Sequence, residues 1–277
     1  MNTLFDKNGI WKLDDYIMLD IENIDFAIEY TLSKFPRVNK IGIASNTTDI
    51  YEINLDFLKK LPHITHFKLS CFLAESVDIQ PIYNLKELQW LQWWSDNKVD
   101  ISKFPKLDTL ICHYSNNIKF DNKNLNSLYL SYSNQLSYLN KIPNLTRLEL
   151  RNYSGKDHLS NLKNLTIRSA KKLIDIKDIL ECKNLYEIEF DGVNKQVDLS
   201  ILSKCNNLRE LYLHMSIPNC LFLKEMRNIE SFVCKEIEDN DLSPIFECKT
   251  LSYVYLYKYK KTYNYNKKEF EKRFPTK

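Results

Sequence analysis

The sequence predicts an α/β solenoid, in which a short strand and a connecting segment repeat and stack side by side. Two observations predict it. A six-residue pattern with apolar residues at its first, fourth and sixth positions recurs eleven times in 277 residues. Glycine, which phosphate loops and hairpin-rich sandwiches need at positive φ, occurs only four times. The chain is long enough to bury a substantial core, and no linker or low-complexity tract divides it.

Each repeat unit is expected to form one strand of a parallel sheet. The units begin 17 to 26 residues apart, and they read VNKIGI from Val38, ITHFKL from Ile64, LKELQW from Leu85, LDTLIC from Leu107, LNSLYL from Leu125, LTRLEL from Leu145, LKNLTI from Leu162, LYEIEF from Leu185, LRELYL from Leu208, IESFVC from Ile229 and LSYVYL from Leu251. Side chains alternate along a strand. The fourth and sixth positions should therefore point into the core, and the third, fifth and seventh should point outward.

The segments between the units carry a second pattern. An aspartate, an aliphatic residue and a serine begin three of them, at Asp100, Asp198 and Asp241. An aspartate before a short apolar turn predicts a capped helical or 3₁₀ segment on the convex side. An apolar residue three positions before nine of the eleven units is expected to be buried as well, and this place is held by Leu61, Ile82, Phe104, Ile142, Leu159, Cys182, Cys205, Met226 and Cys248.

The repeated LxxLxL pattern resembles that of leucine-rich-repeat proteins, and the Asp-[Ile/Leu]-Ser linkers are similar to those of bacterial internalin-type repeats. The resemblance covers residues 38–256. It implies a leucine-rich-repeat horseshoe with a parallel concave β-sheet and short helical, 3₁₀ or irregular convex segments. The asparagine common at the ninth position is present as Asn46, whereas Phe72, Trp93, Ser115 and Tyr153 replace it in other units. Neither the secretion signal nor the wall anchor of internalins is expected.

Both ends are expected to cap the solenoid. Apolar residues recur every three or four positions between residues 13 and 35, which predicts an amphipathic helix as the N-terminal helical cap; they are Ile17, Ile21, Ile24, Ile28 and Leu32. The lysine-rich C-terminus should shield the edge of the last strand. The predicted organisation is a cap over 1–37, repeats over 38–257 and a cap over 258–277, in one continuous domain.

The strand alternation brings charged side chains together on the concave face. Three arginines should form a basic strip beside an acidic strip, because adjacent strands lie about 4.8 Å apart. The partner-binding surface is expected to comprise Arg147, Glu149, Arg151, Arg168, Glu187, Glu189, Asp191, Glu210, Tyr212, His214, Tyr255 and Tyr257. The same charges could instead be mutually neutralising surface ion pairs. Tyr212, Tyr253, Tyr255 and Tyr257 could likewise be a contact row or a tyrosine-rich last strand under the cap.

Three of the four tryptophans lie in ELQWLQWWSD, residues 87–96. In the register of LKELQW, Leu88 and Trp90 belong to the core, and Trp93 packs over the turn. The outward positions are then Glu87, Gln89 and Leu91. Trp94 is left as the only tryptophan of this group expected at an exposed contact.

No catalytic residue, cofactor or metal site is expected. The motifs HExxH, GxSxG, Walker A and GxGxxG do not occur. The outward histidines His66, His113 and His214 lie several strands apart, and most cysteines occupy core positions of the repeat. Cys71 could lie on one strand with His66, but a cysteine nucleophile needs a base beside it, and catalysis there is disfavoured.

These features favour a non-enzymatic protein-binding module that acts through its concave face, such as a bacterial adaptor or an immunity-type protein. The partner is expected to be another protein, and the chain a cytoplasmic monomer. Seven scattered cysteines without a CxxC pair fit a reducing compartment. The acidic N-terminus lacks a signal peptide's apolar run, and no stretch is apolar enough for a membrane helix.

Two alternatives stay open. The first is a nucleic-acid-binding protein that would use the tyrosines and lysines of the C-terminus, namely Lys258, Lys260, Lys261, Lys267 and Lys268. A net charge of only +3 and the acidic strip count against it. The second is a cryptic enzyme.

Overall fold

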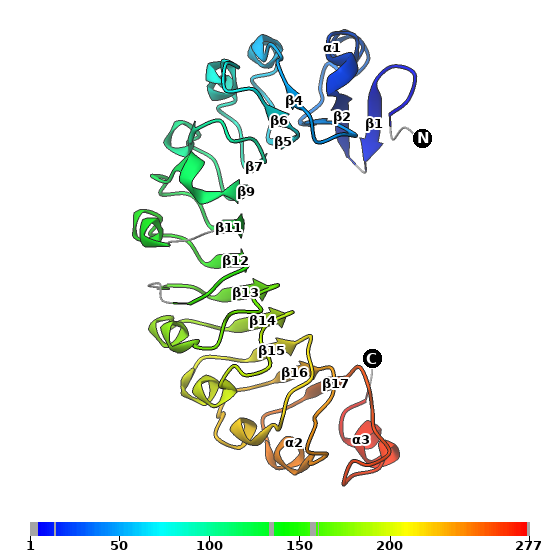
Figure 1. The fold of residues 1–277 in the computed structure, drawn as a ribbon, viewed down its shortest axis with the longest axis vertical. Helices are drawn as coiled ribbons and strands as arrows, with labels where there is room; N and C mark the ends of the chain where they lie inside the picture. Colours follow the sequence, from blue (N-terminus) through cyan, green and yellow to red (C-terminus); the bar gives the residue numbers. More distant parts are fainter. Residues whose placement is uncertain (1–4, 14, 133–135, 156–158, 160, 276–277) are drawn as a thin grey trace. The chain divides into compact units, whose positions relative to one another are not determined.

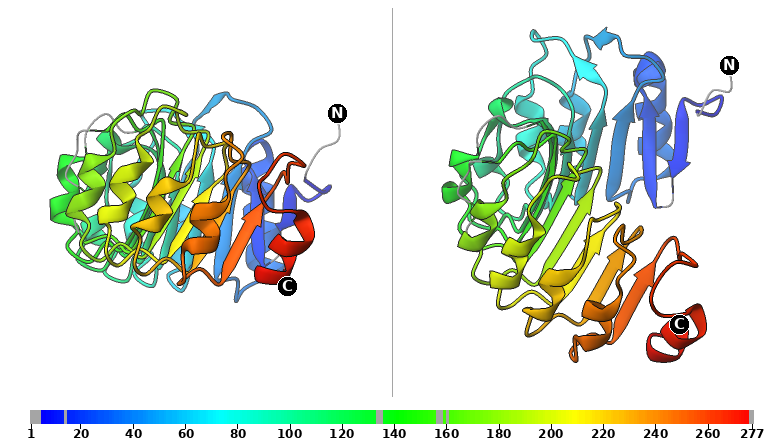
Figure 2. Two further views of the ribbon diagram at one scale, coloured as in Figure 1. Left: turned by 90° about the horizontal axis from the view of Figure 1, so that it is seen from below. Right: turned by 60° about the horizontal axis from the view of Figure 1, so that its bottom comes forward.

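The computed structural model describes residues 5–13, 15–132, 136–155, 159 and 161–275. The chain divides into two compact units, 1–131 and 132–277. In each unit strands stand side by side, and short helical segments connect them along one face of the sheet (Figures 1 and 2). We call the other face, which these segments leave uncovered, the open face.

The first unit holds seven strands in the spatial order β1-β2-β3-β5-β7-β9-β11. They span Ile10–Leu13 (β1), Tyr16–Asp20 (β2), Lys40–Ala44 (β3), His66–Ser70 (β5), Trp90–Trp93 (β7), Thr109–Tyr114 (β9) and Ser127–Tyr132 (β11). β1 and β2 form an antiparallel hairpin, while β2, β3, β5, β7 and β9 pair in parallel. Two pairs of two-residue strands, β4 (Ile50–Tyr51) with β6 (Phe72–Leu73) and β8 (Val99–Asp100) with β10 (Ile118–Lys119), extend the connecting segments.

The N-terminal prediction of one helix over residues 13–35 is wrong in its first half. Residues 16–20 form β2, and the helix α1 spans only Ile24–Lys34, after the 3₁₀ turn η1 (Ile21–Asn23). Ile17 belongs to the strand because it pairs with Ile41 of β3. α1 connects two parallel strands, so it is a crossover segment, and the edge of the sheet is formed by β1 instead.

The tryptophan-rich unit begins three residues later than predicted. Leu91 pairs with Phe67, and Trp93 pairs with Leu69, so the core positions of this strand are Leu88, Leu91 and Trp93. Leu91 and Trp93 are 0% and 1% exposed. Trp90, predicted as core, lies beside His66 on the open face, and Leu91, predicted to point outward, is buried. The unit is therefore LQWLQW.

This shift also changes which residue lies three positions before the unit. The backbone amide of Leu88 donates to Leu85, as the amide of Ile64 donates to Leu61 in the preceding unit. Leu85, not Ile82, is thus the residue three positions before this unit. Both are fully buried, so burial alone does not distinguish them and the hydrogen-bond register does.

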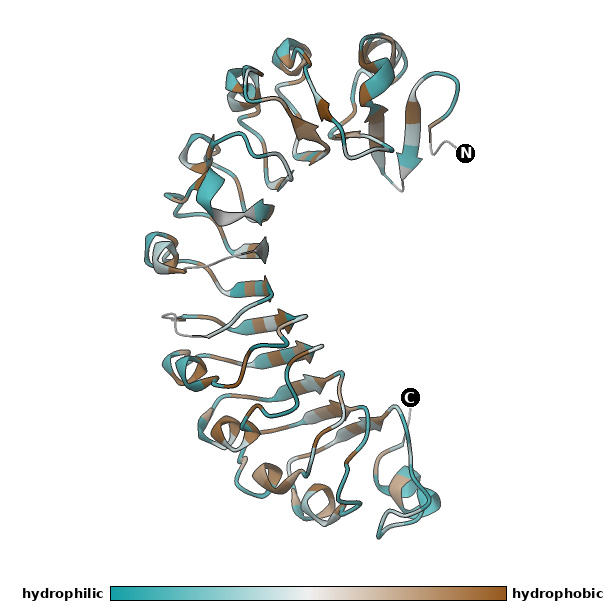
Figure 3. Ribbon diagram, in the orientation of Figure 1, coloured by the Kyte–Doolittle hydropathy of each residue, from teal (hydrophilic) through white to brown (hydrophobic). Residues whose placement is uncertain are grey.

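The second unit holds six strands in the order β12-β13-β14-β15-β16-β17, all of them parallel. They span Arg147–Arg151, Asn164–Arg168, Glu187–Asp191, Glu210–Leu213, Ser231–Cys234 and Tyr253–Leu256. Apolar and polar bands alternate along β12, β13 and β14 in Figure 3. The fourth and sixth positions of every unit are buried here, as predicted. The eleven units supply every strand except β1, β2 and the two-residue strands β4, β6, β8 and β10.

Short 3₁₀ segments connect the strands, as the aspartate–serine linkers predict. They are η2 (Asp56–Lys60), η3 (Gln80–Asn84), η4 (Ile101–Lys103), η5 (Ser115–Asn117), η6 (Ser137–Lys141), η7 (Lys177–Glu181), η8 (Leu199–Lys204) and η9 (Leu221–Lys224), with the short helix α2 (Ser243–Glu247) before the last strand. The Asp100 carboxylate accepts from the amide of Ser102, and Asp198 and Asp241 do the same two residues before their serines. These caps satisfy amides that the short segments leave free.

An asparagine ladder was missed from the sequence. The side-chain amide of Asn207 donates to the carbonyl of Lys183 in the preceding repeat at 2.7 Å, and Asn228 donates to Asn206 in the same way. The asparagine stands directly before the first apolar residue of its unit. The recurring Asn-Leu or Asn-Ile dipeptide was the available signal.

The C-terminal segment folds as a cap with an aromatic core. The helix α3 (Lys267–Arg273) starts with a capping box in which Asn266 and Glu269 bind each other's backbone amides. Phe270 and Phe274 are buried, and Phe274 packs on Phe246 of α2 with ring centroids 5.8 Å apart. The cap is held by apolar contacts under its lysine-rich surface.

Candidate functional site

All twelve residues predicted to bind a partner lie on the open face of the second unit. Strand pairing sets them in rows across β12–β17, because equivalent positions of parallel strands stand next to each other. Arg147 and Arg151 are exposed, as are Tyr255 and Tyr257, and the other eight are half-buried. The sheet therefore brings the predicted residues together.

Arg168 is the centre of the charged part of this face. Its guanidinium lies 3.1 Å from Glu149 on β12, and 2.9 and 3.2 Å from Glu189 and Asp191 on β14. Partial burial alone would lower the pKa of Arg168, but the charges of Glu149 and Glu189 raise it. The basic and acidic strips are thus linked through one arginine that three carboxylates hold in place.

The network continues to the last strand through His214. Its Nε2 lies 3.2 Å from Glu189, and its Nδ1 lies 2.9 Å from the hydroxyl of Tyr257. Tyr257 in turn packs edge-to-face on Tyr255, with ring centroids 5.1 Å apart. Residues from β12 to the end of β17 therefore form one connected polar surface.

Two carboxylates on this face have only neutral hydrogen-bond donors among the described residues. Glu187 accepts from the side-chain amide of Asn164 at 2.5 Å, and Glu210 accepts from the hydroxyl of Tyr212 at 2.7 Å. Glu187 and Glu210 stand directly opposite each other on β14 and β15. Like charges in this arrangement repel, so their negative charge is available to a cation from outside.

Burial and the neighbouring carboxylates also affect Tyr212. Burial raises the pKa of its hydroxyl, and the hydrogen bond to Glu210 raises it further. The hydroxyl therefore stays protonated and serves as a donor. The arrangement thus joins charged and polar side chains across neighbouring strands.

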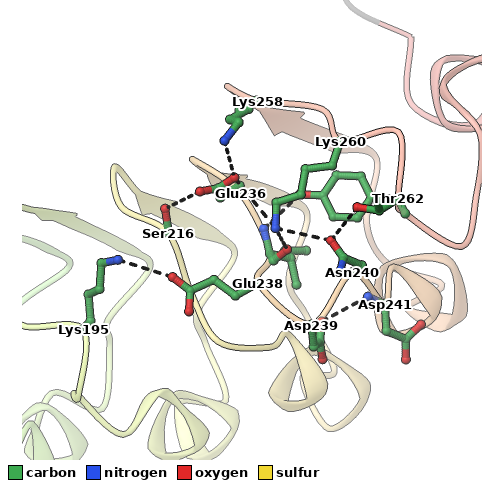
Figure 4. A network of polar contacts seen from close by, with 12 residues as sticks. Lys195, Ser216, Glu236, Glu238, Asp239, Asn240, Asp241, Lys258, Lys260 and Thr262 are labelled. Carbon is green, nitrogen blue, oxygen red and sulfur yellow. Dashed lines mark hydrogen bonds and ion pairs between the residues drawn. The ribbon is translucent and has the colours of Figure 1, made fainter.

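The lysine-rich C-terminal segment is tied to the loop after β16. Lys258 pairs with Glu236 at 3.0 Å, and Lys260 donates to the carbonyl of Ile237 at 2.8 Å (Figure 4). In the same cluster Ser216 donates to Glu236, and Lys195 lies 3.3 Å from Glu238. Two of the lysines assigned to the nucleic-acid alternative are therefore engaged within the protein.

The first unit has an aromatic cluster that the sequence analysis missed. Tyr16 of β2 and Trp90 of β7 lie with ring centroids 5.9 Å apart, and His66 of β5 stacks on Trp90 at 6.1 Å. All three are half-buried on the open face. The sequence does not predict this cluster, because its pattern assigns Trp90 to the core and Tyr16 to a helix.

The cysteines are core residues with little reactivity. Six of the seven are buried, and Cys205 is half-buried. Burial raises the pKa of Cys71 to about 12, so its thiolate is scarce at neutral pH. Among the described residues no group of three histidines, cysteines or acidic residues is arranged to hold a metal ion. In the same part of the chain, no helix has the length and apolar character needed to cross a membrane.

The sequence matches no family model and no curated protein. Among solved structures, it is similar to TLR13 in the TLR13–ssRNA13 complex, with 15% identity over 87% of this chain and 39% of that one, and a TM-score of 0.54. It is similar to the Toll–Spatzle complex of Drosophila, with 11% identity over 91% and 38% and a TM-score of 0.52. An internalin (inlF) from Listeria monocytogenes has 14% identity over 87% and 80%, and a TM-score of 0.45.

The present chain spans less than two fifths of the length of the matched chains in these two complexes. At these identities the likeness concerns the fold and does not extend to the ligand. One parallel strand for each LxxLxL unit, with a short 3₁₀ or helical connection between most strands, is the same architecture. The chain therefore has the leucine-rich-repeat fold.

Proposed function

We propose that this chain is a non-enzymatic protein-binding module, and that its second unit binds a partner through the open face of β12–β17. The single observation that carries the proposal is the pair Glu187 and Glu210. These carboxylates face each other with neutral donors only, beside a rigid network around Arg168. Such a like-charged pair costs stability in the free protein. It is expected at a surface where a partner supplies the compensating positive charge.

Exposed tyrosines beside these charges support the same surface. Tyr255 and Tyr257 are 36% and 53% exposed, and tyrosine is enriched at interfaces because it offers a large contact area at low entropic cost. The similar solved structures support binding in general terms only, since one is a complex with ssRNA13 and another a complex with Spatzle. An adaptor or immunity-type role and a cytoplasmic location remain predictions.

The nucleic-acid alternative has weaker support. Base stacking needs accessible aromatic rings, but Tyr263 is buried and its hydroxyl accepts from the amide of Ile237. Tyr265 stacks on Phe246 at 3.8 Å, within the cap. Tyr263 and Tyr265 therefore pack within the cap.

Photo-crosslinking tests the proposed surface. A photoreactive phenylalanine analogue would replace Tyr255 on the open face or, as a control, Leu221 on η9, which is 54% exposed on the opposite side. In extracts of the source organism we expect a discrete protein adduct from position 255 and none from position 221. Equal adducts from both positions, or adducts from position 221 alone, would refute the assignment.

A charge reversal then tests the carboxylate pair. Glu187→Lys with Glu210→Lys should abolish the adduct at position 255. Glu189 and Asp191 should stay unchanged in this variant, because their replacement would release Arg168 and disturb the face itself. Glu225→Lys, on the side of the connecting segments, is the matched control and should leave the adduct unchanged.

A further inference from the structure

The aromatic cluster of the first unit lies on the open face, where each of its three rings keeps part of its surface exposed. Tyr16 and Trp90 contact each other although β3 and β5 lie between their strands. This contact is possible because Lys40, the residue of β3 in the same row, turns to the carboxylate of Asp15 and lies over the Tyr16 ring at 5.8 Å. The rings therefore close above the backbone of the two inner strands.

Beside the cluster, Gly42 has no side chain and leaves room for Met18. A Cβ atom at Gly42 would lie 2.5 Å from the sulfur of Met18, so only glycine lets Met18 lie flat across β3. Met18 is 1% exposed, although its strand position faces the open side. The stem of Lys68 lies against the same glycine, since the Lys68 Cβ would be 3.0 Å from the added atom.

The charge of this face is mainly positive, because Asp20, the outward acid of β2, is buried and caps the following turn. The outward positions of β3, β5, β7 and β9 include two lysines and two histidines but no aspartate or glutamate; they are Lys40, Gly42, Ala44, His66, Lys68, Ser70, Trp90, Gln92, Trp94, Thr109, Ile111 and His113. Asp15 neutralises Lys40. Lys68 forms no ion pair with any other described residue and stands next to the apolar cluster.

We propose that this aromatic cluster is a docking site for an acidic segment of a protein partner, with an apolar side chain on Trp90 and Tyr16 and a carboxylate on Lys68. Tryptophan and tyrosine are the residues most often found as binding hot spots. An ion pair at the edge of an apolar contact is partly desolvated and therefore stronger than one in water. The site lies wholly within residues 1–131, so it is independent of the surface proposed for the second unit.

A single-stranded nucleic acid is the other occupant with negative charge and flat rings. Its affinity depends on several cationic contacts to phosphates. Here Lys40 is already paired, and burial and the nearby Lys40 lower the pKa of His66, so that ring is neutral at pH 7. Among these outward positions, Lys68 is the lysine that forms no ion pair with another described residue. A single such cation favours binding of one carboxylate over binding of a phosphate backbone.

The first experiment selects binders to the full-length protein from a displayed library of random dodecapeptides. We expect the selected sequences to combine an aromatic or aliphatic residue with a neighbouring aspartate or glutamate. A selected peptide, made with a fluorescent label, should bind the Trp90→Ala and Lys68→Glu variants roughly tenfold or more weakly than the wild type. Glu225→Lys, beside the connecting segment η9 of the second unit, should bind it normally.

A charge exchange makes the test specific. The same peptide with its acidic residue changed to lysine should regain affinity for Lys68→Glu and lose it for the wild type. Trp90→Phe should retain most of the binding, and thermal unfolding by circular dichroism should show both Trp90 variants folded. Selection of basic peptides, no selection, or unchanged affinity in Trp90→Ala overturns the proposal. Binding of labelled oligothymidylate that Trp90→Ala abolishes overturns it in favour of a nucleic-acid site.

Discussion

Two tryptophans three residues apart have opposite surroundings, which predicts opposite effects of their removal. Trp93 is 1% exposed, and its indole nitrogen donates to the carbonyl of Asn97 at 3.0 Å. Trp93→Ala should therefore lower the free energy of unfolding by about 3–5 kcal/mol. Trp90→Ala, on the open face, should lower it by less than about 1 kcal/mol. Urea denaturation measures the free energy of unfolding of both variants. A larger loss for Trp90→Ala than for Trp93→Ala would support the register in which Trp90 belongs to the core.

Arg168 should contribute more to stability than an ordinary surface arginine. Its side chain is 28% exposed, and Glu149 and Glu189 are 18% and 20% exposed. Arg168→Met therefore leaves Glu189 without its arginine and Glu149 with only Arg151, at 3.8 Å. We expect a loss of about 1–3 kcal/mol in urea denaturation, since removing one partner of a buried pair is costly. Lys59→Met breaks a pair that is 55% exposed on both sides and should have no measurable effect. Equal losses in the two variants would contradict the central role of Arg168.

Strand alternation was enough to predict which residues share the open face, but it did not specify their contacts. Arg168 was predicted in a basic strip beside an acidic strip, with ion pairs between the charges as the alternative, and it bridges carboxylates on both neighbouring strands. Which partner a long side chain reaches depends on its rotamer, which sequence period does not determine. The slipped unit has a simpler cause. Leu85 and Leu88 both start a run with apolar residues at positions one, four and six, because Trp90 and Trp93 both fit the sixth position.

Among the elements, the C-terminal helix α3 offers the clearest test of how a cap is held. It has only seven residues, too few for stability on its own. Asn266→Ala removes the side chain that accepts from the amide of Glu269 and should cost about 1 kcal/mol. Hydrogen exchange in 267–273 should accelerate severalfold while β12–β15 keep their protection. Asn266→Asp can still cap the helix and serves as the control; an equal acceleration in both variants would contradict the capping role.

The two ends differ in how far the sequence predicted them. The C-terminal cap follows the last strand as expected, and its buried Phe270 and Phe274 recur at the four-residue spacing of a helix. At the N-terminus, isoleucines spaced by three or four residues suggested a single helix. Ile17 fits that spacing by coincidence, and its partner Ile41 in the next strand decides its conformation. Pairing between strands overrides local period at such positions.

Across the whole molecule, the open faces of the two units carry different charges. The outward positions of β3, β5, β7 and β9 have no acidic residue, while those of β12–β15 include Glu149, Glu187, Glu189, Asp191 and Glu210. A net charge of +3 conceals this difference. Once the register is correct, the sequence predicts it without a structure, because alternation assigns each charge to a face. The same repeat pattern can therefore support two binding surfaces that differ in charge.

Acid should destabilise the protein through its capping and paired carboxylates. The hydroxyl of Ser200 lowers the pKa of Asp198, that of Ser243 lowers the pKa of Asp241, and Lys258 lowers the pKa of Glu236. At a given low pH the unfolded chain therefore binds more protons at these groups than the folded chain does. Their contribution is fully present above the unfolded pKa values and is lost as the pH falls below about 5. Urea midpoints measured from pH 7 to pH 3 should decline over this window.

The matched control for this prediction is the double variant Asp198→Asn with Asp241→Asn. Asparagine keeps an oxygen that accepts from the amides of Ser200 and Ser243, and it does not titrate. The urea midpoint of this variant should therefore fall less steeply between pH 5 and pH 3 than that of the wild type, while the two agree more closely at pH 3. A slope identical to that of the wild type would assign the acid sensitivity to other carboxylates. A midpoint that rises as the pH falls would contradict the sign of the effect, because it requires the folded chain to bind the additional protons.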